Sequence, residues 1–334
     1  MNTTTVCPTA TAHRAAGQAA EAARVARCIH PAEVTHSLIA PIRHALAYAR
    51  SRTCDFTLGG IYMWQRRFAY RCAVVDDTVF MTGLAEGSDT PVPAWAVPVG
   101  AMDTRLAVAA VLRYCRALGI APVFSAVPVE YLDMICGVMG PDATVTEITD
   151  WADYLYSARD LATLTGKRYN KKRNHVNRFV HDNPTWQLED LTPELIPETL
   201  LFLSGHRRPE WDTEDPMLSM ALYEHNACAD TLRNFRHFPF EGAVLRGSDG
   251  DIVAFSVAEV IGDTAYVHIE KANHNVAGAG EAINHFFAAR LLQNHPSLRY
   301  LNREDDSGDL SLRRAKTSYH PISLLAKFNI SLPR

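Results

Sequence analysis

The stretch Gly242–Asn294 decides the fold, and it reads GAVLRGSDGDIVAFSVAEVIGDTAYVHIEKANHNVAGAGEAINHFFAARLLQN. Three strands are predicted in it, at Gly242–Arg246, Ile252–Val260 and Thr264–Ile269. The short polar segments between them are typical of hairpin turns. A helix is predicted from Gly280 to Asn294, because Ile283, Phe286, Phe287 and Leu291 recur at helical spacing. The stretch therefore predicts an antiparallel sheet followed by a helix that packs on it.

The rest of the chain repeats this order of elements. In the first half, strands are predicted at Phe56–Trp64, Phe68–Val75, Thr78–Thr82, Val123–Val127 and Val145–Ile148, and helices at His36–Arg50, Asp103–Leu118 and Val129–Val138. In the second half, further elements are predicted at Pro193–Ser204, Pro216–Arg233, Arg299–Asn302, Leu310–Ser318 and Ile322–Phe328. We expect two copies of one α/β (α+β) layer fold joined near residue 150. The predicted parts are a loose or partly helical tail (1–30) and two domains (31–150 and 151–334).

Composition fits a globular protein of this size. The 334 residues are 47% hydrophobic and 21% charged, with a formal net charge of -4. The seven cysteines are scattered without a C-x-x-C pair, which indicates reduced thiols. No apolar run reaches the length of a membrane helix, and the first residues lack the apolar core of a secretory signal. We expect a cytoplasmic protein without an integral membrane segment.

A strongly basic stretch precedes the second sheet. Leu161–Asn183 reads LATLTGKRYNKKRNHVNRFVHDN and contains Lys167, Arg168, Lys171, Lys172, Arg173 and Arg178 within twelve positions. Its apolar residues fall at helical spacing, so it is predicted to be one helix with an apolar face and a cationic face. Such a face suits a polyanion, for example a phosphate chain or an RNA end. The alternative is an ordinary solvated charged face.

Two segments after the third strand of the opening stretch carry polar chemistry. The turn Glu270–Gly280 has small residues before a helix N-terminus, and Gly278 and Gly280 could form a phosphate cradle there. It matches neither a P-loop nor a dinucleotide fingerprint, and an ordinary turn is the alternative. Glu270 is a candidate general base, and a buried Glu paired with Lys271 or Arg303 is the alternative.

The acidic run Asn302–Asp309 ends a predicted strand. Its carboxylates could bind an amine or act as a base, whereas Asp309 is explained as a helix N-cap. Tyr319 could protonate a leaving group, and a packed aromatic is the alternative. The histidines have no zinc spacing and the acidic run is not an EF-hand loop, so no metal is expected.

Several strings resemble the C-terminal-domain-like family of bacterial phosphatidylglycerol lysyltransferases. They are Tyr154–Tyr156, Asp160–Leu161, Gly166–Phe179, His268–Ala272, Ala282–Asn284, Asn302–Asp306, Leu312–Lys316 and Ser318–Pro321. The resemblance is strong from about residue 151 to 328 and traceable from Asp55 to Gly83. It implies two tandem GNAT-like domains, each a mixed, mostly antiparallel sheet flanked by helices, with the active site in the second.

The resemblance also implies a function. Better-known relatives move an aminoacyl group from aminoacyl-tRNA to a hydroxyl or amine, with no metal and no permanently bound cofactor. Because the lipid-modifying enzymes have a membrane-spanning half that this chain lacks, the expected acceptor is a small molecule or a cell-envelope component. The oligomeric state is left open.

Roles follow for individual residues from this resemblance. Lys167, Arg168, Lys171, Lys172 and Arg173 would meet tRNA phosphates, with Gly278, Gly280 and Lys271 facing the terminal phosphate or the oxyanion. Glu270, Glu304 and Asp305 are the expected catalytic residues, Glu270 being the base. Asn302, Arg303, Asp306, Lys271 and Tyr319 are expected to bind substrate, and the acids Glu304, Asp305 and Asp306 would hold the α-ammonium of the amino acid.

Two other functions stay open. The first is an acyl-CoA-dependent N-acyltransferase, whose pyrophosphate would lie on Ala277–Gly280. Those enzymes favour Gln or Arg where this chain has Asn275, which weakens the CoA hypothesis. The second is a non-catalytic GNAT-like binding module, because a fold does not determine a function.

Overall fold

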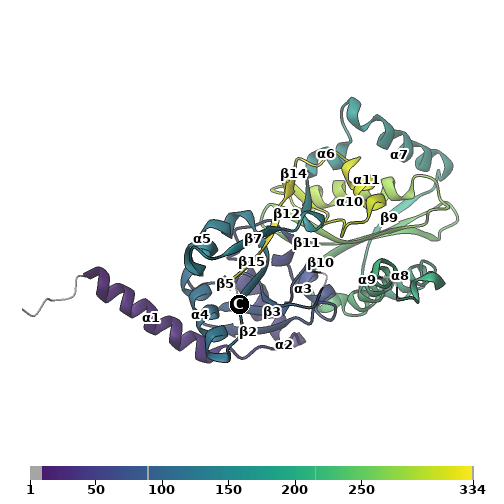
Figure 1. Cartoon of the computed structure of the whole chain (residues 1–334). Helices are drawn as coiled ribbons and strands as arrows, with labels where there is room; N and C mark the ends of the chain where they lie inside the picture. Colours follow the sequence, from purple (N-terminus) through teal and green to yellow (C-terminus); the bar gives the residue numbers. More distant parts are fainter. Residues whose placement is uncertain (1–9, 89, 215, 333–334) are drawn as a thin grey trace, which may run out of the picture. The chain divides into compact units, whose positions relative to one another are not determined.

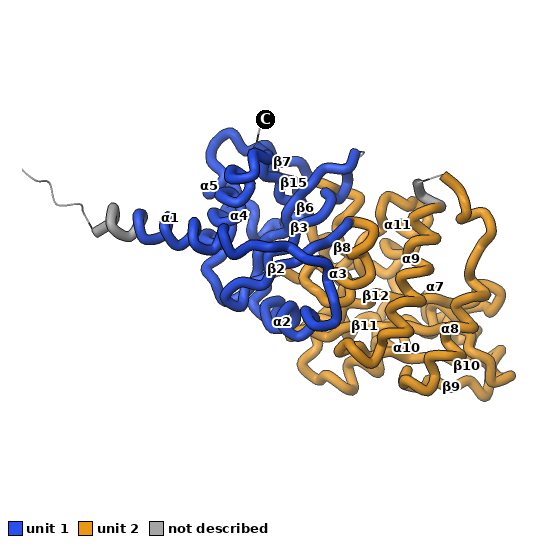
Figure 2. The backbone as a smooth tube through the Cα atoms, turned by 90° about the horizontal axis from the view of Figure 1, so that it is seen from below, with its two compact units in different colours: residues 1–50, 69–147, 328–334 blue, residues 51–68, 148–327 orange. Residues whose placement is uncertain are grey.

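The structure is a computed structural model that describes residues 10–332 except 89 and 215. The chain divides into two compact units (Figure 2). Unit 1 contains residues 1–50, 69–147 and 328–334, and unit 2 contains residues 51–68 and 148–327. The predicted junction near residue 150 lies close to the change of unit at 147/148. The sequence did not indicate that 51–68 belongs to unit 2 or that the last residues belong to unit 1.

Unit 1 is built on a mixed sheet of strand order β1-β2-β3-β4-β6-β15-β7, with β5 paired to β3. The strands are β1 (Ala32–Glu33), β2 (Arg71–Val75), β3 (Thr78–Leu84), β4 (Pro93–Trp95), β5 (Val99–Gly100), β6 (Val123–Pro128), β7 (Thr144–Glu147) and β15 (Lys327–Ser331). Its helices are α1 (Ala10–Cys28), α2 (His36–Leu46), α4 (Thr104–Leu118) and α5 (Val129–Met139). As predicted, Asp103 caps α4 and Gly119 ends it in a left-handed conformation.

Unit 2 is built on a sheet of strand order β14-β8-β13-β12-β11-β10-β9. The strands are β8 (Asp153–Ser157), β9 (Gln187–Asp190), β10 (Phe240–Arg246), β11 (Ile252–Ile261), β12 (Thr264–Ala272), β13 (Tyr300–Asn302) and β14 (Ser323–Leu325). Its helices are α3 (Leu58–Trp64), α6 (Ala158–Thr163), α7 (Asn170–Asp182), α8 (Ile196–Ser204), α9 (Pro216–Arg233), α10 (Ala279–Asn294) and α11 (Leu310–Thr317). Among the described strands of this sheet, only β12 and β13 form a parallel pair. Figure 1 shows α6, α7 and α10 on one face of this sheet and α8 and α9 on the other.

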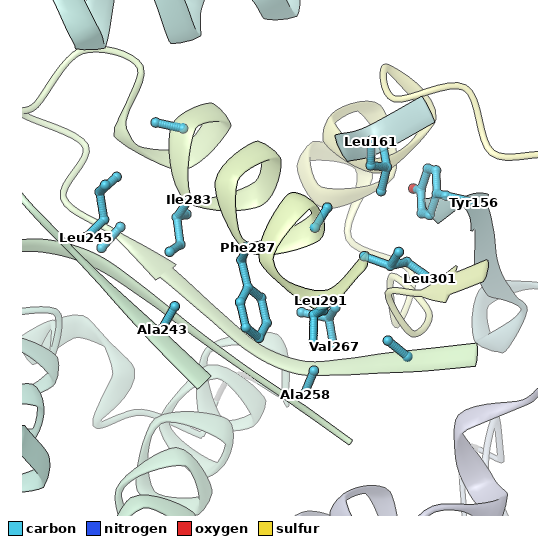
Figure 3. Packing of buried hydrophobic residues seen from close by; sticks show 14 of the residues in the cluster. Tyr156, Leu161, Ala243, Leu245, Ala258, Val267, Ile283, Phe287, Leu291 and Leu301 are labelled. Atoms are coloured by element: carbon cyan, nitrogen blue, oxygen red, sulfur yellow. The ribbon is translucent and has the colours of Figure 1, made fainter. Parts of the chain in front are cut away.

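The core of unit 2 lies between α10 and the sheet (Figure 3). Ile283, Phe287 and Leu291 point from α10 onto the strands, where they meet small residues such as Ala243 and Ala258. Burying each large side chain contributes about 1.5–3 kcal/mol. The apolar face predicted for this helix is confirmed for these three residues, whereas Phe286 is only partly buried and stacks on Trp186.

Three predicted elements are wrong. Phe56–Trp64 is not a strand but a 3-10 turn (Cys54–Phe56) followed by α3, whose N-terminus is capped by the Thr57 hydroxyl. The basic stretch is not one helix, because Leu164 and Gly166 have positive φ angles of 47° and 97° and separate α6 from α7. The final predicted strand is two strands, β14 and β15.

The structure describes only part of the predicted N-terminal tail. Residues 1–9 of the predicted tail lie outside the described residues. From Ala10 the chain forms α1, whose Ala22 and Val25 are buried and which packs against α4. Of the two alternatives predicted for the tail, loose or partly helical, the structure has the helical one from Ala10 to Cys28, because an alanine-rich segment with an apolar stripe favours a packed helix.

Cysteine oxidation state and membrane insertion can be addressed for the described residues. Six cysteines, at positions 28, 54, 72, 115, 136 and 228, are free thiols. In the same part of the chain, every helix is too short or too polar to cross a membrane.

Candidate functional site

The parallel strands β12 and β13 separate soon after they pair. Thr264–Tyr266 pairs with Tyr300–Asn302, but β12 continues to Ala272 without this neighbour. Beyond the paired part, side chains bridge the two strands. Arg303 Nη2 lies 2.8 Å from Glu270 Oε1, and Glu304 Oε1 lies 2.7 Å from His268 Nδ1.

A β-bulge in β12 sets the direction of Glu270. Val257 of β11 pairs with Ile269, and Ala258 pairs with Val267, so His268 is the extra residue. Before the bulge, Val267 faces α10, and after it Glu270 also faces α10, where it accepts a hydrogen bond from Asn284 at 3.1 Å. Bulges often re-aim side chains next to active sites.

A group of polar residues surrounds Glu270 and the ring of Tyr319, and we call it the Tyr319 cluster. Its members are Lys172, Glu270, Glu281, Asn284, Arg303 and Tyr319. The Arg303 guanidinium lies 4.9 Å from the centroid of the Tyr319 ring, and Lys172 Nζ lies 3.9 Å from the same centroid. Lys172 Nζ also lies 3.4 Å from Glu281 Oε1. The cluster joins α7 and α10 to the ends of β12 and β13, so the basic helix and the separated strands meet at one place.

Burial and charge shape the titration of this cluster. Burial disfavours the charged guanidinium of Arg303, but the Glu270 carboxylate together with Tyr156 and Tyr319 outweighs it, so the pKa of Arg303 is raised. Burial lowers the pKa of Lys172, and Glu281 offsets only part of this effect. Burial raises the pKa of Tyr319, which makes its hydroxyl a poorer proton donor. The Glu270 carboxylate lies beside the Arg303 guanidinium, and about a fifth of its side chain is exposed (20%), so it is a candidate for proton transfer.

The remaining basic residues divide into exposed and packed groups. Lys167 and Lys171 are exposed. Arg168 is half exposed and pairs with Asp160. Arg173 donates to the carbonyl oxygens of Leu164 and Gly166, so it holds the break between α6 and α7 together. Lys167, Arg168 and Lys171 therefore form the surface available to an anion, whereas Arg173 has a structural contact.

The glycine-rich turn before α10 is covered by α7. Gly278 has a φ of 80°, and a Cβ atom there would lie 2.2 Å from the carbonyl oxygen of His175. The glycine thus permits the close approach of α7 to the start of α10. A Cβ at Gly280 would lie 3.7 Å from the nearest atom, Ala272 Cβ, which is an ordinary contact.

Gly278→Ala is expected to destabilise the fold by about 2 kcal/mol or more, because the new methyl group is strained and meets a backbone carbonyl. Gly280→Ala is the matched control. It should be neutral or stabilising, because alanine is the better helix former in α10. Urea unfolding of both variants measures the difference, and equal midpoints would contradict the packing described here.

The acidic run already has partners inside the chain. Asp306 is buried, accepts a 2.6 Å hydrogen bond from the Tyr154 hydroxyl and pairs with Arg313. Burial raises the pKa of Asp306, but these partners outweigh it and lower that pKa. Asp305 accepts from the Ser307 amide and hydroxyl, and Asn302 is fully buried against Asp153. These contacts give the acidic run a structural role, which the sequence did not indicate.

Glu304 belongs to a buried triad. The imidazole of His268 lies between Glu304, at 2.7 Å, and Glu259, at 3.5 Å. Burial opposes the charge on His268, but the two carboxylates outweigh it and raise its pKa to about 9. Glu304 has a positive φ of 57°, which allows Arg303 and Glu304 to reach different partners. The backbone at the end of β13 therefore determines the position of Arg303.

Lys271 is paired away from Glu270. Its ammonium lies 2.7 Å from Glu224 of α9, so it is on the α9 face of the sheet. Burial opposes its charge, but Glu224 outweighs it and raises the pKa of Lys271. The structure does not bring Lys271 together with the Tyr319 cluster or the turn at Gly278.

A second buried charge group lies at the start of β8. Among the described residues, Cys54, Asp55 and Asp153 form the one set with ligand atoms close enough to hold a metal ion. The ammonium of Lys327 lies 2.9 Å from Asp55 and 2.8 Å from Asp153. It thus neutralises the two carboxylates in the position a cation would take.

Sequence reasoning missed four residues that organise these sites. Glu281 and Asn284 belong to the Tyr319 cluster, Lys327 holds the buried acids, and Lys316 donates to the carbonyl oxygens of Arg303 and Asp305. Spacing on α10 could have found Asn284, since a polar residue recurs there on an otherwise apolar face. Lys316 ends the string Leu312–Lys316, which carries the resemblance but gave it no role, and Lys327 gave no signal, because isolated lysines are usually exposed.

Comparison with known proteins assigns the family. Residues 46–330 match the family described as "Phosphatidylglycerol lysyltransferase, C-terminal". Among curated proteins, no sequence relative of this chain is found.

Solved structures agree on the fold. A conserved protein of unknown function from Bacteroides thetaiotaomicron is 28% identical, with a TM-score of 0.80 over 91% of this chain and 100% of that one. The C-terminal domain of a putative lysylphosphatidylglycerol synthetase from Agrobacterium fabrum is 15% identical, with a TM-score of 0.58 over 89% and 92%. L-PGS from Bacillus licheniformis is 14% identical, with a TM-score of 0.56 over 79% and 84%. The last two likenesses concern the fold alone.

The fold class predicted from sequence, a tandem GNAT-like arrangement of mixed sheets flanked by helices, is confirmed. The family is named for the transfer of a lysyl group, which is an acyl transfer. The chain belongs to the phosphatidylglycerol lysyltransferase C-terminal family, and hence to a family of acyltransferases.

Proposed function

We propose that this protein transfers an aminoacyl group from aminoacyl-tRNA to an amine or hydroxyl of a small molecule or cell-envelope acceptor. One observation carries the proposal. Lys172 of the basic helix α7 and Arg303 at the separated strands lie on the same Tyr319 ring. A surface suited to RNA phosphates and a carboxylate suited to proton transfer are therefore adjacent.

The reaction needs little from the enzyme, because an aminoacyl ester is already activated. The acceptor nitrogen or oxygen attacks the ester carbonyl carbon, a new C–N or C–O bond forms, and the ester C–O bond to the tRNA ribose breaks. Glu270 takes the proton from the acceptor and returns it to the ribose oxygen, which leaves as a hydroxyl. The guanidinium of Arg303, beside Glu270, favours negative charge on the carbonyl oxygen in the transition state.

The other site residues receive revised roles in this proposal. Lys167, Arg168 and Lys171 bind phosphates. Glu304 acts as a positioning residue through His268 and the turn after β13, and Asn302, Asp305 and Asp306 hold that turn in shape. We do not retain the acidic run as the site of the α-ammonium, because Glu304 and Asp306 are committed to internal partners.

Transfer from acyl-CoA is the second candidate. Its pyrophosphate would need the turn before α10, but the backbone of α7 lies against Gly278. This contact favours the aminoacyl-tRNA donor over CoA.

The proposal is tested by incubating the protein with total charged tRNA and a cell extract, followed by mass spectrometry for an added aminoacyl mass. We expect a new aminoacylated product that disappears when the tRNA is deacylated. A product that forms with acetyl-CoA and without tRNA would support the CoA alternative. No product from either donor would favour a binding module.

Lys167→Ala combined with Lys171→Ala is expected to weaken tRNA binding and to reduce the slope of log affinity against log salt by about two, one for each phosphate contact. Filter binding between 50 and 200 mM salt measures the slope. Arg113→Ala with Arg116→Ala, on exposed positions of α4, removes the same charge elsewhere. Equal slopes in the two double variants would remove the basic surface from the proposal.

A further inference from the structure

The contacts around Lys172 suit an ammonium group, but they hold the ammonium of Lys172 only weakly. Its Nζ atom is 3.9 Å from the Tyr319 ring centroid, within the range of a cation–π contact. Its carboxylate partner Glu281 is 3.4 Å away, whereas a good charge-assisted hydrogen bond measures about 2.7–2.9 Å. Ring face and carboxylate thus define a position for a primary ammonium.

The surroundings make Lys172 easy to displace. Only 12% of its side chain is exposed, so its charge loses most of its hydration. Arg303 lies against the same ring, and burial together with this like charge favours neutral Lys172. Lys172 lies in the first turn of α7, beside the exposed Lys171, so its flexible stem can turn toward a phosphate on the helix surface.

We propose that the Tyr319 ring and the Glu281 carboxylate form the binding site for the α-ammonium of the donor's aminoacyl group, and that Lys172 occupies this site until the donor replaces it. The inference rests on the proposed function for the identity of the donor. It adds the ligand class, a primary ammonium, and assigns Glu281 and Tyr319 to its recognition. When RNA binds, Lys172 exchanges its intramolecular partner for a phosphate and opens the site.

The proposed ammonium site lies close to Glu270, the proposed base of the transfer reaction. Glu281 and Glu270 both belong to the cluster, and Asn284 lies one turn after Glu281 on α10 and donates to Glu270. The Oδ1 atom of Asn284 and the Nη1 atom of Arg303 are buried and have no hydrogen-bond partner among the described residues. An aminoacyl ester carries the complementary groups, an ammonium that donates and a carbonyl oxygen that accepts.

The test uses small amines, so it does not depend on tRNA or on transfer. Alaninamide has an α-ammonium, and N-acetylalaninamide lacks it. Binding of both to the full-length protein is measured by ligand-observed NMR titration at pH 7. We expect Lys172→Ala and Lys172→Met to bind alaninamide about tenfold more tightly than the unmodified chain, because the resident ammonium is gone, with no gain for N-acetylalaninamide.

Matched variants distinguish the gain in alaninamide affinity caused by removing the Lys172 ammonium from the effect of removing any positive charge. Arg178→Ala, which removes an exposed cation further along α7, should leave alaninamide affinity unchanged. Adding Glu281→Gln or Tyr319→Leu to Lys172→Ala should abolish the gain, whereas adding Tyr319→Phe should keep it because the ring face remains. Circular dichroism establishes that each variant is folded.

The outcomes distinguish the two proposals. If Lys172→Ala and Lys172→Met bind alaninamide no better than the unmodified chain, the ammonium site is wrong, even if tRNA-dependent transfer is observed. If the expected pattern appears but aminoacyl-tRNA gives no product, the ammonium site stands and the proposed donor is wrong.

Discussion

Glu270→Gln is expected to slow aminoacyl transfer by about 10²- to 10⁴-fold, the usual contribution of a general base. The amide has nearly the same shape and can still accept the hydrogen bond from Arg303, but it cannot take a proton from the acceptor. Single-turnover transfer from charged tRNA measures the effect, with tRNA affinity recorded in parallel. We expect tRNA affinity to change little, because Glu270 faces Arg303 and Asn284 rather than the exposed lysines.

Removing this charge also leaves the guanidinium of Arg303 without its carboxylate, so stability has to be controlled. Glu270→Asp keeps the charge and should recover part of the rate. Glu189→Gln removes a carboxylate from another ion pair of the same sheet, with Arg246, and should leave transfer unaltered. If Glu270→Gln transfers within a few-fold of the unmodified chain while folded, Glu270 is not the base.

Lys327→Met is expected to destabilise the fold by about 3–5 kcal/mol at pH 7, the cost of leaving buried charge uncompensated. Lys327 is 1% exposed, and its ammonium lies between the carboxylates of Asp55 and Asp153. Burial already raises the pKa of Asp55, so its ionised form is disfavoured in the folded state. Urea unfolding at pH 7 measures the loss.

The direction in which the stability loss of Lys327→Met changes with pH can also be predicted. A carboxyl group whose pKa is raised by folding costs stability when it is ionised. This cost begins to shrink as the pH falls through the folded pKa and is gone once the pH is below the lower, unfolded pKa. The deficit of Lys327→Met should therefore shrink in mild acid. Asp55→Asn should restore part of the stability of Lys327→Met at pH 7, and Lys171→Met, on the exposed surface, should have almost no effect. A deficit that grows in acid would contradict this explanation.

The local sequence pattern predicted the layers of unit 2, but it did not predict to which face of the sheet the Glu270 side chain points. The turns between β10, β11 and β12 and the apolar face of α10 are all encoded within a few residues, and each is confirmed. Simple alternation along β12 would put Glu270 on the face opposite Val267. The bulge at His268 reverses this, and it depends on the pairing with β11, which no local pattern contains.

In the acidic run Asn302–Asp309, the local sequence suggested a binding site but did not show the internal partners of the acids. Three adjacent acids are typical of a binding site, yet two of them have partners on other elements: His268 for Glu304, and Tyr154 and Arg313 for Asp306. Likewise, α3 was mistaken for a strand, because its aromatic and aliphatic residues favour strands locally. The structure has α3 there, and its packing requires a glycine, since a Cβ atom at Gly59 would lie 2.2 Å from the His268 ring.

The interleaved units have a consequence for synthesis on the ribosome. β15 lies between β6 and β7 in the sheet of unit 1, yet it is made last. The first unit therefore cannot complete its sheet until residues 148–327 have been translated. Its unpaired strand edges stay available to chaperones, or to aggregation, for the whole of that interval. A ribosome stalled before residue 327 would carry a protease-sensitive nascent chain, however long the N-terminal part has had to fold.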